Sequence, residues 1–167
     1  EEYDKLLNNK TRIVAVNHVS NALGTINPVN EITRKAHAVG AKVLIDGAQS
    51  TPHMKVDVKD IDCDFYTFSG HKMYAPSGIG GMFAKMEVME TMTPYVTGGD
   101  MILQVTLEKT TYAKPPARFE AGTPPISQVI GLGAAIDYLN TIGMDKIFEY
   151  EKSLLDYGTR LLNDIDG

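Results

Sequence analysis

Two short, largely apolar segments, each followed at once by chemically reactive residues, constrain the fold of this chain more than any other feature. Residues 42–45 lead into Asp46, and the aromatic-rich residues 65–68 lead into the polar segment 69–72. A third such run occupies residues 12–16. Runs of this length with little alternation are typical of strands buried on both faces of a parallel sheet. The three segments therefore predict an α/β fold with a mostly parallel sheet.

Helical patterns lie between and after these strands. Asn27 is expected to cap a helix whose first position is Pro28, and apolar residues then recur at helical spacing until Gly40. The other elements expected in the first two thirds of the chain are a strand near 82–84, a short helix near 87–92, and a loop or extended arm over 97–116.

Two long helices are expected near the end of the chain. Ser127 is expected to cap the first, which ends at Gly143, and Asp145 to start the second. We take Gly143 as a domain boundary, with residues 1–142 forming part of a large domain and residues 143–167 beginning a smaller one. The apolar residues expected to face inward are Ile130, Ala134, Ala135, Leu139 and Ile142 in the first helix, and Ile147, Leu154, Leu161 and Ile165 in the second.

Composition narrows the classes of partner. The formal net charge of −5 argues against nucleic acid or an anionic membrane as the main partner. A single cysteine, Cys63, excludes an intrachain disulfide and a thiolate metal cluster. The expected location is the cytoplasm, and no membrane association is expected because no apolar run approaches the ~20 residues of a spanning helix.

Reactive side chains follow all three predicted strands. Ligands of open α/β sheets bind beyond the carboxyl ends of the strands. These ends carry the polar turn 17–21, Asp46 with Gln49, and the segment 69–72, which contains Lys72. We therefore expect the three groups to line one crevice.

A lysine and a carboxylate at two such strand ends match the two poles of a pyridoxal 5′-phosphate (PLP) site. The Lys72 amine would form a Schiff base and later move the α-proton of a substrate. Asp46 would pair with the protonated pyridine nitrogen and make the ring a better electron sink. Each residue also has a plainer interpretation, because most lysines are solvated and a carboxylate at a strand end is often a turn residue.

Four neighbouring residues extend this interpretation. Gln49 and Asn21 can hydrogen-bond the phenolic oxygen of the ring, and Ser69 and His71 can donate to a phosphate. Taken singly, Gln49 could equally be a surface amide, and Ser69 and His71 are each more often turn residues.

The remaining histidines and the cysteine receive structural interpretations. His37 is expected on the solvent side of its helix, and His18 and His53 lack metal-ligand spacing with any partner, so no metal site is expected. Cys63 lies between Asp62 and Asp64, and these carboxylates would raise the pKa of its thiol. We interpret it as structural and not as a nucleophile.

The chain resembles the class V aminotransferase-fold enzymes, most closely the SufS-type (group II) cysteine desulfurases and selenocysteine lyases. The segments that carry the resemblance are HVSNALGTINPV, AKVLIDGAQSTPHMKVDV, DCDFYTFSGHKMYAPSGIGG, GGDMI, RFEAGTP and IGLGAAIDYL. They cover almost all of the chain. The resemblance implies the type I PLP-dependent transferase fold, a homodimer whose large domain has a seven-stranded, mostly parallel sheet and whose C-terminal domain is smaller.

The resemblance also implies roles for individual residues. Lys72 would bind PLP covalently, Asp46 would pair with the pyridine nitrogen, and Gln49 would contact the phenolic oxygen. Ser69 and His71 would hold the phosphate.

Two further roles depend on substrate and on a second subunit. Asn21 would contact substrate or cofactor, and Thr123 would reach the phosphate bound to the partner subunit. The family's ring-stacking histidine, phosphate-binding threonine loop, nucleophilic cysteine and substrate-binding arginine have no counterpart here. Because Cys63 does not match that cysteine, we expect the chain to be a central fragment of a longer enzyme.

The activity implied by the resemblance is conversion of L-cysteine to L-alanine, with the sulfur passed as a persulfide to an acceptor protein for iron–sulfur cluster assembly. Selenocysteine lyase is an alternative, since one site can serve both substrates in this family. Kynureninase-like and epimerase-like enzymes are less favoured by RFEAGTP. A further alternative is that the 167 residues fold but do not turn over, because they lack the nucleophilic cysteine.

Overall fold

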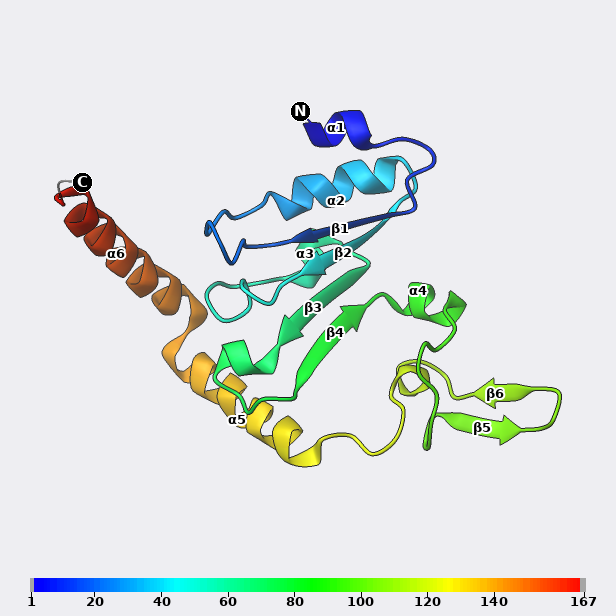
Figure 1. Cartoon of the computed structure of the whole chain (residues 1–167). Coiled ribbons are helices and arrows are strands. Elements are labelled where there is room, and N and C mark those ends of the chain that lie inside the picture. Colours follow the sequence, from blue (N-terminus) through cyan, green and yellow to red (C-terminus); the bar gives the residue numbers. More distant parts are fainter. Residues whose placement is uncertain (1, 166–167) are drawn as a thin grey trace.

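A four-stranded sheet forms the centre of the computed structural model, which describes residues 2–165 (Figure 1). Its strand order is β1 (Ile13–Asn17), β2 (Lys42–Asp46), β3 (Phe65–Ser69) and β4 (Gly80–Ala84). The first three strands are parallel and β4 is antiparallel to β3. The three strands predicted from the apolar runs are therefore confirmed, as is the α/β class.

Helices and turns connect these strands. The remaining elements are α1 (Glu2–Leu6), α2 (Val29–Ala38), α3 (Val58–Ile61), the 3₁₀ turn η1 (Gly70–Met73), α4 (Met86–Thr91), the 3₁₀ turn η2 (Ala117–Phe119), α5 (Ile126–Ile142) and α6 (Met144–Asn163). Between α4 and η2 the chain forms a hairpin of β5 (Ile102–Val105) and β6 (Thr110–Tyr112). This hairpin confirms the extended arm expected over 97–116, although its strand pairing was not predicted.

The main core lies between α2 and one face of the sheet (Figure 1). The helix buries Val29 and Ala36, and the sheet contributes Val43, Ile45 and Tyr66 from alternate positions of β2 and β3. Because successive strand residues point to opposite faces, Asp46 and Thr67 face away from this core. The apolar side of α2 thus covers the face of the sheet to which Val43, Ile45 and Tyr66 point.

The predicted helix caps are wrong in detail. The Asn27 side chain does not cap α2; its Nδ2 donates to the main-chain oxygen of Asn17 at 2.8 Å and ties the turn to the end of β1. Ser127 lies inside α5, which begins at Ile126. Proline precedes both helices, and its fixed φ suits the first turn without a side-chain cap.

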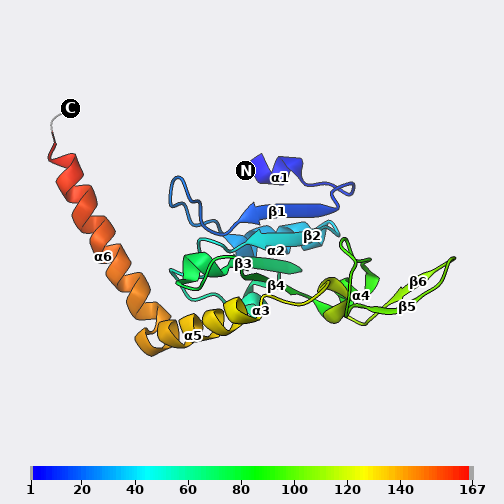
Figure 2. The same cartoon turned by 60° about the horizontal axis from the view of Figure 1, so that its bottom comes forward.

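The inward face expected for the last two helices is confirmed only in part. Ala135 and Leu139 of α5 are buried, whereas Ile130, Ala134 and Ile142 are exposed. In α6 no residue is buried. Figures 1 and 2 show the reason, since α6 extends away from the sheet and no other element among residues 2–165 covers its length.

The predicted break between these helices occurs at Gly143, which has a φ of 93° that glycine adopts readily. Whether this break is also a domain boundary stays a prediction. No helix in the described part of the chain is long and apolar enough to cross a membrane.

A buried carboxylate joins α2, β2 and β3 at the amino-terminal edge of the sheet. Asp64, 1% exposed, accepts hydrogen bonds from the main-chain nitrogen of Val43 at 2.8 Å, from His37 Nε2 at 2.8 Å and from Lys42 Nζ at 3.0 Å. The prediction that His37 faces solvent is therefore wrong, because the last turn of α2 passes over this edge. Burial alone would raise the pKa of Asp64, but the three hydrogen bonds outweigh it and lower the pKa.

We expect Asp64→Asn to lower the free energy of unfolding by about 2–3 kcal/mol at pH 7, the usual contribution of hydrogen bonds to a buried charge. Because the folded-state pKa is lowered, this contribution is present above the unfolded value of about 4 and is lost as pH falls through the folded value. Urea titrations at pH 7 and pH 3 measure the difference. The exposed Asp156→Asn is the control, and an unchanged difference at the two pH values would contradict the expectation.

Candidate active site

The carboxyl ends of β2 and β3 bring Asp46 and the lysine segment to one edge of the sheet. Asp46 is the last residue of β2, and its Cα pairs with Thr67 of β3. Lys72 lies in η1, which follows β3 directly. Since β2 and β3 are parallel neighbours, both groups occupy the edge at which α/β sheets bind ligands.

Gly70 sets the position of the lysine turn. It is buried, and its main-chain nitrogen donates to the oxygen of Ile79 at 2.9 Å. A Cβ at this position would lie 2.7 Å from Ile79 Cγ2, so only glycine lets the chain returning to β4 pack against η1. The contact holds Lys72 half-buried, one turn beyond the strand.

The turn that follows β2 is closed by its own hydrogen bonds. The carboxylate of Asp46 is exposed, and its Oδ1 accepts from the main-chain nitrogen of Ala48 at 2.9 Å. The main-chain nitrogen of Gly47 donates to the oxygen of Thr67 at 2.8 Å, which joins the turn to β3. Gln49 is half-buried within the same turn.

Two potential phosphate donors lie beside the lysine. Ser69 Oγ and His71 Nδ1 are 2.8 Å apart, at the end of β3 and in η1. The two side chains therefore form one polar pair just before Lys72 in the sequence, and their shared role at a phosphate stays a prediction.

The last two predicted site residues are exposed and lie further along the connecting segments. Asn21 occupies the turn between β1 and α2, beyond the carboxyl end of β1. Thr123 lies in the segment that leads from η2 into α5. The roles of both stay predictions.

Cys63 lies at the opposite edge of the sheet. It precedes β3, whose five residues separate it from the lysine turn by about 16 Å at ~3.3 Å per residue. Its side chain is fully buried, and this burial, more than the acidic neighbours considered above, raises the pKa of the thiol to about 11. Cys63 is therefore a buried structural thiol.

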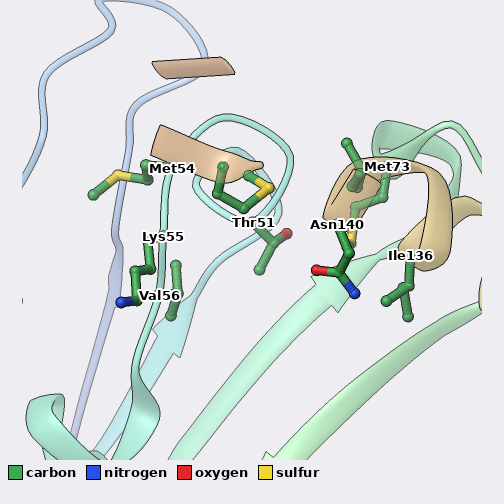
Figure 3. A pocket seen from close by; sticks show the side chains of 9 residues that line it. Thr51, Met54, Lys55, Val56, Met73, Ile136 and Asn140 are labelled. Atoms are coloured by element: carbon green, nitrogen blue, oxygen red, sulfur yellow. The ribbon is translucent and has the colours of Figure 1, made fainter. Parts of the chain in front are cut away.

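A cavity of about 220 Å³ lies between the turn after β2, η1 and α5 (Figure 3). Met54 and Val56 line one side, and Met73, Ile136 and Asn140 line the other. Most of the lining side chains are apolar, and the polar side chains among them are those of Thr51, Lys55 and Asn140. It lies beside the lysine turn, which also contacts α5 directly.

Sequence reasoning missed one group of polar residues beneath this edge. The Tyr66 hydroxyl lies 2.9 Å from His18 Nδ1 and 2.5 Å from Ser50 Oγ. Tyr66 reads as an ordinary core aromatic in the sequence, and no spacing rule links positions 18, 50 and 66. Among residues 2–165, no group of three or more histidine, cysteine or acidic side chains is placed to hold a metal ion.

The donor set at the carboxyl edge fits PLP. It combines a primary amine, a carboxylate at the neighbouring strand end, an amide in the turn and a hydroxyl–imidazole pair. These groups match in turn the aldehyde, the pyridine nitrogen, the phenolic oxygen and the phosphate of that cofactor.

Comparisons with known proteins agree with this chemistry. A cysteine desulfurase of Enterobacter sp. (strain 638) is 56% identical over 158 residues, which are 94% of this chain and 39% of that protein. The crystal structure of the cysteine desulfurase CsdA from Escherichia coli superposes with a TM-score of 0.94 at 36% identity, over 98% of this chain and 41% of CsdA. The chain thus spans about two fifths of the length of these relatives.

A third protein provides a link to the cofactor. C-DES, solved as a mutant with glycine covalently linked to its PLP cofactor, has a TM-score of 0.85 at 27% identity, over 96% of this chain and 44% of its own. The Aminotransferase class-V family matches residues 1–167, the entire sequence. The sheet, the site at its carboxyl edge and this match agree, and the chain belongs to the class-V aminotransferase family.

Proposed function

We propose that this chain supplies the cofactor-binding core of a PLP-dependent cysteine desulfurase, which converts L-cysteine to L-alanine and passes the sulfur to an acceptor. The observation that carries the proposal is the placement of Lys72 and Asp46 at one edge of the sheet, after two adjacent parallel strands. The 56% identity to a cysteine desulfurase supports the choice of reaction within the family.

Each residue at this edge has a separate proposed role. Bound PLP supplies an electron sink for the bonds at the substrate α-carbon. Lys72 Nζ would hold the cofactor, and its free amine would carry the substrate α-proton. Asp46 keeps a proton on the pyridine nitrogen, and Ser69 with His71 donates to the phosphate. Gln49 hydrogen-bonds the phenolic oxygen.

The proposal extends to the assembly. Asn21 contacts substrate or cofactor from the end of β1. Thr123, exposed ahead of α5, reaches the phosphate in a second subunit, so the complete site belongs to a homodimer. The sulfur acceptor serves iron–sulfur cluster assembly in the cytoplasm.

The 167 residues do not contain an accessible thiol for the sulfur-transfer step. Their single cysteine, Cys63, is fully buried, with a pKa near 11 and at the wrong edge of the sheet. Because the thiolate is the nucleophile in persulfide formation, this chain alone has no group to accept sulfur. We infer that cofactor binding and sulfur transfer reside in different parts of the intact enzyme.

Borohydride reduction after incubation with PLP, followed by peptide mapping, tests the cofactor site. We expect one pyridoxyl group on Lys72 and its loss in Lys72→Ala, because reduction traps the bond between the amine and the aldehyde. Lys55→Ala, which removes an exposed lysine, is the matched control and should keep the label. Label distributed over several lysines, or none, would refute the proposed function.

Incubation of the PLP-loaded 167-residue chain with L-cysteine tests the division of roles. We expect no catalytic sulfide or alanine, and no reaction of Cys63 with a thiol reagent until the protein is unfolded, because the thiol is buried and protonated. Sulfide quantification with and without dithiothreitol gives the readout. Multiple turnovers that persist in Cys63→Ser would show that sulfur leaves without a protein thiol.

A further inference from the structure

Four hydrogen bonds within the turn that carries Asp46 and Gln49 converge on the main-chain oxygen of Gly47. This oxygen accepts from the main-chain nitrogens of Ser50 at 3.1 Å and Thr51 at 3.0 Å, and from their hydroxyls at 3.1 and 2.9 Å. The orientation of the two proposed cofactor ligands therefore depends on whatever holds Gly47 and Ser50.

The Tyr66 hydroxyl joins this turn to the segment that follows β1. It lies 2.5 Å from Ser50 Oγ on one side and 2.9 Å from His18 Nδ1 on the other. The main-chain nitrogen of His18 donates in turn to the oxygen of Asp46 at 2.8 Å. These hydrogen bonds form a closed circuit, which we call the Tyr66 circuit. It runs from the Asp46 oxygen to His18, from His18 to the Tyr66 hydroxyl, and from there through Ser50 Oγ to the Gly47 oxygen.

The ring of Tyr66 supports the same turn by contact. Tyr66 is 2% exposed, and a Cβ on Gly47 would overlap its ring. The backbone of the turn therefore packs directly against the ring of Tyr66 near its hydroxyl. Glycine at position 47 is required by this close approach and not by its φ.

The circuit is uncharged at neutral pH. Burial raises the pKa of Tyr66 to about 12 and lowers the pKa of His18. The phenol, with one proton, donates to one of its two neighbours and accepts from the other. Loss of that hydroxyl would leave buried polar atoms of His18 and Ser50 without this partner, which is costly in a dry interior.

We propose that Tyr66, through the circuit of His18 and Ser50, is a positioning residue that aims Asp46 and Gln49 at the cofactor from beneath the sheet. The inference rests on the proposed function, since it assigns Asp46 and Gln49 to PLP. If Tyr66 only packed in the hydrophobic core, its ring would be required but its hydroxyl would not. Removal of the hydroxyl alone therefore distinguishes a positioning role from a packing role.

Tyr66→Phe removes the hydroxyl and keeps the ring. We expect the PLP dissociation constant to rise about fivefold, the effect of one lost hydrogen bond. Asp46→Asn serves as the reference variant, because it changes the proposed ligand of the pyridine nitrogen directly. The visible absorbance of the bound cofactor, and its dependence on pH, should shift in Tyr66→Phe in the same direction as in Asp46→Asn, but by a smaller amount. Tyr3→Phe is the matched control, because it likewise removes one hydrogen-bonded tyrosine hydroxyl. The Tyr3 hydroxyl donates to the main-chain oxygen of Ile32 at 3.0 Å, on α2 and away from the site.

Amide hydrogen exchange without PLP provides a readout that does not depend on the cofactor. In Tyr66→Phe the amides of Ser50 and Thr51 should exchange several-fold faster, whereas those of β1 should not change. Ser50→Ala breaks the circuit at its other end, and combined with Tyr66→Phe it should add little further effect. Should Tyr66→Phe fail to fold, Ser50→Ala alone makes the same test.

The outcomes separate the two proposals. Wild-type protein that takes no label on Lys72 would overturn the proposed function and the positioning role with it. A labelled wild type whose Tyr66→Phe and Ser50→Ala variants keep PLP affinity, spectrum and exchange rates unchanged would overturn the positioning role alone.

Discussion

Parallel pairing of β2 with β3 is the constraint on which the rest of this structure depends. Parallel strands end at the same edge, so residues that follow them in sequence meet in space although 26 positions separate Asp46 from Lys72. The pairing also divides the sheet by function. Its carboxyl edge holds the proposed PLP ligands, while its amino edge holds the buried Asp64 with His37 and Lys42.

The two edges of the sheet differ in how their carboxylates are stabilised. A buried carboxylate is tolerated at the amino edge because three donors from α2 and β2 satisfy it, and those bonds fix how the helix crosses the sheet. At the carboxyl edge Asp46 is exposed, with one oxygen engaged by the turn. An exposed carboxylate held by its backbone keeps the capacity to accept a bond from a ligand. The proposed role of Tyr66 would supply rigidity from beneath the site, where it does not compete with a cofactor for the carboxylate of Asp46.

The sequence predicted those parts of the fold that local patterns determine. Apolar runs located β1, β2 and β3, and the proline–glycine pair at positions 28 and 40 bounded α2. It also placed Asp46 and Lys72 at one edge, because that follows from strand polarity alone. The prediction that Asn27 caps α2 was wrong because its side chain bonds instead to Asn17, ten residues earlier and on another element. The prediction that His37 faces solvent was wrong for the same reason, because its partner Asp64 lies 27 residues away in the sequence.

The least predictable features are contacts whose partners are distant in sequence and ordinary in type. Nothing in the order of residues connects His18, Ser50 and Tyr66; only the sheet does, by placing the start of one turn, the end of another and the middle of β3 together. Periodicity likewise assigned an inward face to α5 and α6, yet a periodic pattern states only that a helix has an apolar face. Whether that face is covered depends on what packs against it, and in residues 2–165 only Ala135 and Leu139 of the predicted set are buried. Local chemistry at the strand ends is therefore the more reliable guide to function, because strand direction alone determines where it lies.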